Sequence, residues 1–179
     1  MNTASTSGHS AASKASRQRR DHGSDSTHVG LLGPRTSVAH CLFTTAHPWT
    51  HLPEGEPGRH ASDDLRILAE TATSVVHCPM VFARRGLAMH SFDRYRVAGI
   101  NLAMGTDTFP RDIIHEMRVA ALVCKVVEGN FLVGNARDLY DAATLGGARL
   151  LGRDDLGRLA PGAKADLIVV DFQDLHVGP

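Results

Sequence analysis

Three side chains that can bind a metal ion or move a proton stand at the ends of short apolar runs. His40 ends the run Ser-Val-Ala-His, His77 ends Ser-Val-Val-His, and Asp107 follows Leu-Ala-Met-Gly-Thr. If the runs are neighbouring parallel strands, these ends meet at one edge of a sheet, where active sites of α/β proteins form. A single histidine in such a position is more often a hydrogen-bonded core residue, but the repetition favours a site.

Imidazole and carboxylate groups that converge in this way suit a divalent metal ion such as zinc, which lowers the pKa of a bound water to about 7. The resulting hydroxide attacks an electron-poor carbon. Asp107 would then bind the metal or accept the proton of the water, and His40 would assist at the leaving group or the oxyanion. The alternative role of Asp107 is that of an N-cap, because Pro110 follows within a turn.

Three short strands are predicted to position these side chains. They cover residues 37–43, 74–77 and 100–104, which are apolar or β-branched and are bounded by turn residues. Because helical segments alternate with these strands, the sequence predicts right-handed βαβ units and a parallel sheet. A complete eight-stranded barrel needs at least about 200 residues, so a chain of 179 residues is too short for one.

Helices are predicted between and after the strands. Ser62 and Ser91 are candidate N-caps, and the helix after Ser91 should place Phe92 and Tyr95 inward and end at Gly99. A long helix is expected to have Pro110 in its first turn and Gly129-Asn130 at its end. Its inward positions recur at three- and four-residue steps: Ile113, Met117, Ala120, Ala121, Cys124 and Val127.

A shorter helix is expected over residues 136–151, and Gly146-Gly147 within it is interpreted as helix punctuation rather than a phosphate-binding loop. Glu116 and Arg118, on the long helix, are expected to make surface contacts. At the end of the chain, Pro161-Gly162 predicts a turn that leads into a strand ending at Asp171.

The composition excludes several classes of protein. The 19 Lys and Arg residues balance the 19 Asp and Glu residues, so no net charge attracts nucleic acid or an anionic membrane. No apolar run approaches the roughly 18 residues of a membrane span. Three cysteines without a Cys-x-x-Cys pair provide neither a disulfide framework nor a Cys-rich zinc site. We therefore expect reduced thiols and a soluble cytoplasmic protein.

Residues 1–29 differ from the rest of the chain, because Ser, Thr, Ala, Gly and His dominate and large apolar side chains are almost absent. Such a segment has too little apolar surface to offset the entropy of ordering, so it is expected to be a disordered tail. A transit peptide or a nucleic-acid-binding arm is the alternative, since Lys and Arg occur there before the first acidic residue, Asp21.

The motifs resemble those of the amidohydrolase superfamily, in the branch of deaminases and chlorohydrolases that includes guanine deaminase and the triazine hydrolases. The matching stretches are Val-Ala-His-Cys, Thr-Ser-Val-Val-His-Cys-Pro, Leu-Ala-Met-Gly-Thr-Asp-Thr and the final Leu-Gly-Arg-Leu-Ala-Pro-Gly-Ala-Lys-Ala-Asp-Leu-Ile-Val-Val-Asp. The resemblance implies that residues 30–152 form strands six to eight of a partial TIM (β/α) barrel. It also implies that residues 153–179 return to a small β-sandwich beside the barrel.

The resemblance implies roles for individual residues as well. Asp107 is the expected metal ligand and shared proton acceptor, His40 the expected catalytic histidine, and His77 a histidine of the substrate pocket, which the loop with His47 borders. The metal is expected to be zinc or, alternatively, iron, and the substrate a small heterocyclic or amidine-like molecule. Arg84 is a candidate for binding an anionic group, although a solvated loop charge is the simpler interpretation.

In this family the metal also needs a His-x-His pair on the first strand and a histidine on the fifth, and the sequence contains no His-x-His. One hypothesis is a metal-dependent hydrolase of carbon–nitrogen or carbon–chlorine bonds, whose missing strands come from another chain or have been lost. The other is a catalytically incompetent half-barrel that acts through protein–protein association. A half-barrel exposes sheet edges and apolar surface, which predicts a homo-oligomer or a complementary segment.

Overall fold

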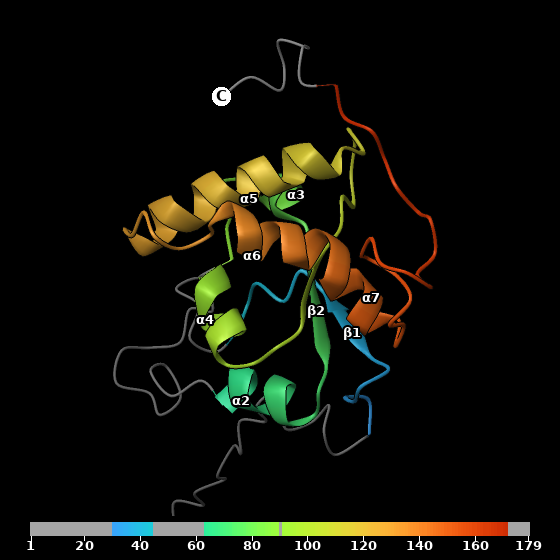
Figure 1. Cartoon of the computed structure of the whole chain (residues 1–179). Coiled ribbons are helices and arrows are strands. Elements are labelled where there is room, and N and C mark those ends of the chain that lie inside the picture. The colour runs from blue at the N-terminus through green and yellow to red at the C-terminus, as the bar shows by residue number, and fades with distance from the viewer. Residues whose placement is uncertain (1–29, 45–62, 90, 172–179) are drawn as a thin grey trace, which may run out of the picture.

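The computed structural model describes residues 30–44, 63–89 and 91–171. Within them, β1 (Ser37–Ala39), β2 (Ser74–His77) and β3 (Leu102–Met104) form a parallel sheet in the order β1-β2-β3 (Figure 1). Val75 of β2 lies opposite Val38 on one side and Leu102 on the other. The predicted parallel sheet of three strands is confirmed, although β1 and β3 are shorter than expected.

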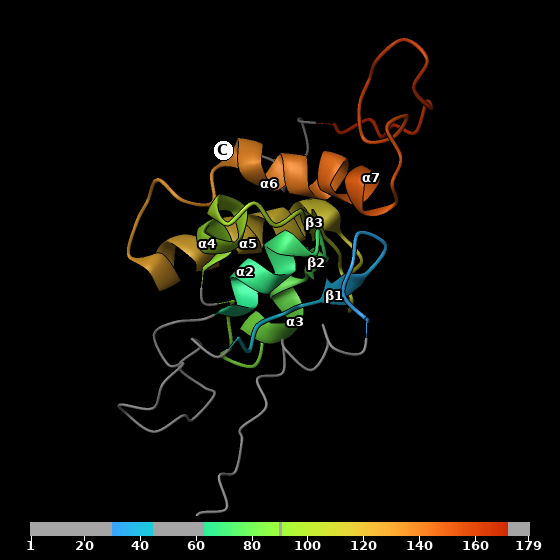
Figure 2. The same cartoon turned by 90° about the horizontal axis from the view of Figure 1, so that it is seen from below.

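Helices connect the strands and cover them, as the view from below shows (Figure 2). The described helices are α2 (Asp63–Glu70), α3 (Pro79–Ala83), α4 (Phe92–Val97), α5 (Ile113–Glu128), α6 (Ala136–Asp141), the π-helix η2 (Ala142–Gly146) and α7 (Gly147–Leu150). Because α2 precedes β2 and α4 precedes β3, the order gives the predicted βαβ units. The helix predicted over residues 136–151 is the continuous run of α6, η2 and α7.

The caps of these helices explain their bounds. The Ser91 hydroxyl accepts a hydrogen bond from the Arg94 N–H, as predicted for α4. Ser62 lies outside the described residues. The expected start of α5 at Pro110 is wrong, because the Asp112 carboxylate accepts the N–H groups of Ile114 and His115 and the helix begins after it. An Asp side chain that satisfies two free N–H groups defines a helix start more strongly than the φ angle of a proline.

The hydrophobic core lies between the sheet and its helices. Phe92 and Tyr95 of α4 are both 2% exposed, which confirms their predicted inward positions. Val127 was predicted to face the core but is 40% exposed, because it lies in the last turn of α5, beyond the packed part of the helix. Other core members are Leu68, Val75, Ile100, Leu102, Ala120, Cys124 and Leu139.

The strand predicted to end at Asp171 is wrong, since residues 164–171 have no strand structure. Strands are stabilised by hydrogen bonds to a neighbouring strand, and within the described residues no strand lies beside this segment. Its apolar side chains therefore remain exposed, and Val169 is 90% exposed.

The expectation of unpaired thiols is confirmed for Cys41, Cys78 and Cys124, which are all free. Within the described part of the chain, no helix has the length and apolar character needed to cross a membrane.

Candidate functional site

The carboxyl edge of the sheet brings together two of the predicted site residues. His40 follows β1 directly and Asp107 follows β3 after two residues, and the His40 Nε2 and Asp107 Oδ2 atoms are 3.7 Å apart. Backbone hydrogen bonds continue beyond the strands, from the His40 N–H to the Val76 carbonyl and from the Gly105 N–H to the His77 carbonyl. The edge is therefore built on the sheet itself and not on a free loop.

Both residues have a backbone conformation that most amino acids avoid. The φ angles of His40 and Asp107 are 66° and 51°, in the left-handed region, and Cys41 follows with 44°. This region costs an L-residue about 1–2 kcal/mol, and such strain persists where the surrounding structure enforces it, often at functional sites. The Tyr95 hydroxyl helps to fix the backbone at His40 and Cys41, because it donates a hydrogen bond of 2.5 Å to the Cys41 carbonyl.

His77, at the end of β2, is 5% exposed. Burial, together with the nearby His40, lowers the pKa of His77 to about 4, so its imidazole is neutral at physiological pH. A neutral imidazole has one N–H donor and one acceptor nitrogen, which suits hydrogen bonding to a heterocycle. The ring of Phe92 supports it from one side, with ring centroids 5.8 Å apart.

Buried polar atoms without a hydrogen-bond partner gather at this edge. In the described residues they are the Nδ1 atoms of His40 and His77 and the Oε1 atom of Glu116. Such atoms are rare in native proteins, and each one indicates a water, an ion, a proton or a ligand that completes it. Their concentration around the carboxyl edge of one small sheet supports a functional site there.

The metal donors present at this edge form a partial set. Among the described residues, no three His, Cys, Asp or Glu side chains lie close enough together to hold a metal ion. His40 and Asp107 provide two donors, whereas a catalytic zinc normally has three protein ligands. The residue types and their spacing fit one side of a metal site that further ligands would complete.

The other two predicted site residues are His47 and Arg84. His47 lies outside the described residues. Arg84 is the C-cap residue of α3 and is exposed, where it contributes electrostatically to the environment of Glu116.

Glu116 is the residue that sequence reasoning placed wrongly. It was expected to make surface contacts, but it is fully buried, and its Oε2 atom accepts a hydrogen bond of 3.0 Å from the Met80 N–H. Charged side chains are rarely buried, so the prediction followed the general rule. The available signal was its spacing, because Glu116 precedes Ala120 by four residues and Cys124 by eight, on the inward side of α5.

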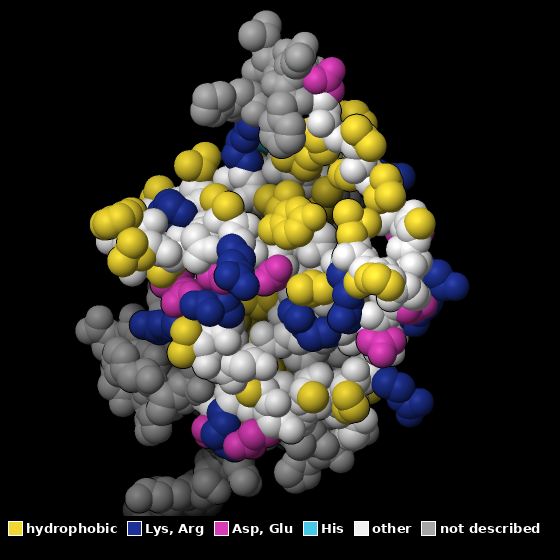
Figure 3. Space-filling model, in the orientation of Figure 1, with side chains coloured by type: hydrophobic (Ala, Val, Ile, Leu, Met, Phe, Trp, Pro, Cys, Tyr) yellow, Lys and Arg dark blue, Asp and Glu magenta, His cyan; other side chains and the backbone are white. Residues whose placement is uncertain are grey.

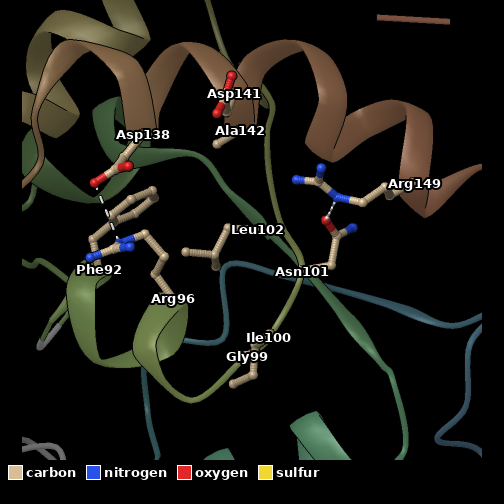
Figure 4. Close-up of a pocket in the computed structure, with 10 residues that line it drawn as sticks. All are labelled: Phe92, Arg96, Gly99, Ile100, Asn101, Leu102, Asp138, Asp141, Ala142 and Arg149. Atoms are coloured by element: carbon tan, nitrogen blue, oxygen red, sulfur yellow. Dashed lines mark hydrogen bonds and ion pairs between the residues drawn. The ribbon is translucent and has the colours of Figure 1, made fainter.

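A separate pocket of about 410 Å³ lies at the opposite, amino end of β3 (Figure 4). Arg96 and Asp138 form an ion pair of 3.4 Å on one side, and on the other the Arg149 Nε atom donates to the Asn101 Oδ1 atom at 2.9 Å. These side chains come from α4, α6, α7 and the residue just before β3, so the pocket lies at the end of the sheet away from the candidate site.

Gly146, in the helix beside this pocket, is not helix punctuation as interpreted from the sequence. The helix continues through it, and a Cβ atom there would lie 2.0 Å from the Leu102 carbonyl oxygen. The glycine therefore allows the helix to approach β3 closely.

Comparison with known proteins decides the family. A model of the Amidohydrolase family matches residues 3–177. This chain belongs to the amidohydrolase family. The 5-methylthioadenosine/S-adenosylhomocysteine deaminase of Halobacterium salinarum is 36% identical over 155 residues, which cover 84% of this chain and 32% of that protein. The chain therefore spans about a third of the length of the curated relative it matches.

Solved structures agree with this assignment. An adenosine deaminase from Xanthomonas campestris with bound zinc is 32% identical, with a TM-score of 0.67, and the match covers 86% of this chain and 32% of that one. The guanine deaminase of E. coli is 27% identical, with a TM-score of 0.59, over 78% of this chain and 29% of that one. Membership in the family means a TIM-barrel-type α/β fold, to which the small parallel sheet and its helices correspond.

Proposed function

We propose that this amidohydrolase chain contributes the strand-six-to-eight side of a metal-dependent deaminase that hydrolyses a carbon–nitrogen bond other than a peptide bond. Residues 30–152 would form the partial barrel and residues 153–179 the segment that returns to a small β domain. The observation that carries the proposal is the meeting of His40 and Asp107, both in left-handed conformation, at the carboxyl edge of the sheet. The deaminase names of the relatives support the reaction class.

In this proposal Asp107 is the metal ligand and His40 the catalytic histidine. A bound divalent ion, with zinc as the first candidate and iron as the alternative, would act as a Lewis acid and activate a water. His40, whose Nε2 atom faces the Asp107 carboxylate, holds a proton within reach of the leaving group. His77 contributes a neutral imidazole that orients the substrate ring, and His47 and Arg84 are proposed to lie at the mouth of the pocket.

The substrate class is a small heterocycle with an exocyclic amine, as adenosine derivatives and guanine have. Asp107 is a single ligand where a catalytic zinc normally has three protein ligands, so we propose that the other ligands come from a second chain or a complementary segment.

Zinc content and ammonia release test the proposal directly. Purified full chain, characterised for its oligomeric state, is analysed for metal beside Asp107→Ala and the control Asp112→Asn, which keeps the cap of α5. We expect close to one zinc per chain in the wild type and the control, its loss in Asp107→Ala, and ammonia release from 5-methylthioadenosine, adenosine or guanine only where zinc is bound. Retention of zinc by Asp107→Ala would refute the assignment of the ligand.

The alternative function is a non-catalytic half-barrel that acts through protein–protein association. It is favoured by the absence, among the described residues, of a group of three metal-binding side chains. A folded wild-type chain without zinc and without ammonia release would exclude metal-dependent catalysis by the chain alone and favour this alternative.

A further inference from the structure

We propose that Glu116 is a positioning residue of the candidate site: from α5 its carboxylate holds the first turn of α3 and thereby sets the direction in which His77 leaves β2. The part of this inference that concerns substrate depends on the proposed function, because His77 is assigned there to the substrate pocket. The contact between Glu116 and Met80 does not depend on it.

The turn that leads from β2 into α3 lacks a local cap. Helix α3 begins with Pro79, which has no N–H group, and the N-cap residue Cys78 makes no side-chain hydrogen bond to the helix. The first free N–H of α3 is therefore that of Met80, which has no partner inside the helix. Glu116, 36 residues further along the chain, provides the acceptor at 3.0 Å. The cap that α3 lacks locally thus comes from α5.

This turn is held from two sides, by β3 and by α5. On the side of β3, the Gly105 N–H donates a hydrogen bond of 3.1 Å to the His77 carbonyl. A Cβ atom at Gly105 would lie only 3.2 Å from the Cys78 Sγ atom, so β3 and the turn pack closely. On the other side, α5 supports the turn through the hydrogen bond that the Met80 N–H donates to the Glu116 carboxylate. Loss of either support removes one of the two hydrogen bonds that hold the backbone between His77 and Met80 from outside α3.

The orientation of the His77 imidazole depends on the backbone that carries it. Its Nδ1 atom is buried without a partner, and no hydrogen bond within the described residues holds the ring. The direction of the ring therefore depends on the backbone at the end of β2 and on its contact with Phe92. A residue that fixes this backbone fixes the ring, although it does not touch it.

Burial of the Glu116 carboxyl group costs free energy of desolvation. Glu116 is fully buried and its Oε1 atom has no partner, so the side chain loses hydration for a single hydrogen bond. Burial raises the pKa of Glu116, while the hydrogen bond from Met80 opposes this shift. An apolar side chain would fill the same space without that penalty. The hydrogen bond to the α3 turn is what Glu116 adds beyond packing.

The test begins with the wild-type full chain. We expect the Met80 amide to exchange with solvent at least about tenfold more slowly than a free amide, because it is hydrogen-bonded. An N–H in the first turn of an uncapped helix has no such protection. A Met80 amide that exchanges as a free amide does would overturn the proposal without any variant.

Two variants separate positioning from packing. In Glu116→Gln the acceptor remains, and we expect the Met80 exchange rate and the NMR signals of the His77 ring to stay as in the wild type. In Glu116→Met the acceptor is lost, and we expect Met80 exchange to rise about tenfold relative to the amide of Ala120, with displaced signals of the His77 ring.

The matched control is Cys124→Ala, a buried change on the same helix that removes core contacts away from α3. It should lower the global stability without moving the His77 signals. Unchanged His77 signals in Glu116→Met, or equal displacement in Cys124→Ala, would contradict the proposal. If Glu116→Met does not fold, wild-type exchange and Glu116→Gln decide. None of these measurements uses zinc or turnover, so failure of the proposed function leaves them interpretable.

Discussion

At the scale of single residues, the left-handed backbone at Asp107 predicts that replacing this residue by glycine abolishes zinc binding without lowering the stability of the fold. In Asp107→Gly the relief of about 1–2 kcal/mol of strain is offset by the larger chain entropy of glycine, about 0.5–1 kcal/mol. We therefore expect the unfolding free energy in urea to remain equal or rise by up to about 1 kcal/mol, while zinc binding is lost.

The control for this change is Asp112→Ala, which removes the N-cap of α5 from a residue with a φ of −119°. It should cost about 1 kcal/mol and leave zinc content unchanged. The interpretation fails if Asp107→Gly is the less stable of the two.

The buried His77 predicts that the unfolding free energy depends on pH. Its pKa is about 4 in the folded chain and about 6.5 in the unfolded chain, so between these values only the unfolded chain takes up the proton. The contribution of His77 to stability is complete above pH 6.5 and is lost as the pH falls toward 4. Urea unfolding at about pH 7.5 and about pH 4.5 should show a loss of about 2.5 kcal/mol from this group.

The variant His77→Gln isolates that contribution. The raised pKa of Glu116 has the opposite effect, because its protonation on acidification favours the folded state, but this effect is common to both proteins. The difference in unfolding free energy between wild type and His77→Gln should therefore shrink as the pH falls. A difference that is independent of pH would show that the His77 imidazole is not buried in its neutral form.

At the scale of secondary-structure elements, two adjacent glycines provide a matched pair. A Cβ atom at Gly146 would collide with the Leu102 carbonyl at 2.0 Å, whereas at Gly147 no atom lies within 4 Å. We expect Gly146→Ala to destabilise the protein by more than about 3 kcal/mol, because backbone must move. Gly147→Ala should be neutral or stabilising by up to about 1 kcal/mol, since alanine favours helix. Thermal unfolding of both variants measures this; equal midpoints would mean that η2 does not pack on β3 as described.

The same elements show how far the sequence predicts the fold. Ser91 and Gly129 were correct helix boundaries because capping and left-handed C-caps depend on nearby residues only. The strand ends at His40 and His77 followed from short apolar runs of the same kind. What could not be predicted depends on distant partners: the close approach of Gly146 to β3 and the burial of Glu116 against Met80 each join segments more than 30 residues apart.

The sequence predicts the placement of the site residues but not their backbone conformation. Placing His40 and Asp107 at one edge required only the parallel order of the strands. Their left-handed φ angles could not be read from the sequence, since neither residue type requires that conformation. The strand predicted before Asp171 failed for a related reason: strand formation depends on a neighbour, which the segment does not have among the described residues.

At the scale of the whole molecule, exposed apolar side chains gather around α5, α6 and the segment after α7 (Figure 3). In that segment Ile168 and Val170 line an apolar pocket of about 410 Å³ against α5, while Val169 points away and is 90% exposed. The segment has no strand structure and, within the described part of the chain, no neighbouring strand. A segment without a neighbouring strand can pair with a strand of another chain through backbone hydrogen bonds.

We therefore expect the full chain to associate with a second copy through residues 164–171. Sedimentation velocity over a range of concentrations should show a reversible monomer–dimer equilibrium in the wild type. Val169→Lys places a charge on the exposed side of this segment without touching the pocket behind it, and should weaken dimerisation about tenfold or more. The control is Val97→Lys, which changes an exposed valine of α4 and should leave the dimer unchanged. A wild type that stays monomeric at high concentration, or an equal effect of both lysines, would contradict association through this segment and direct the search to the edge of β1.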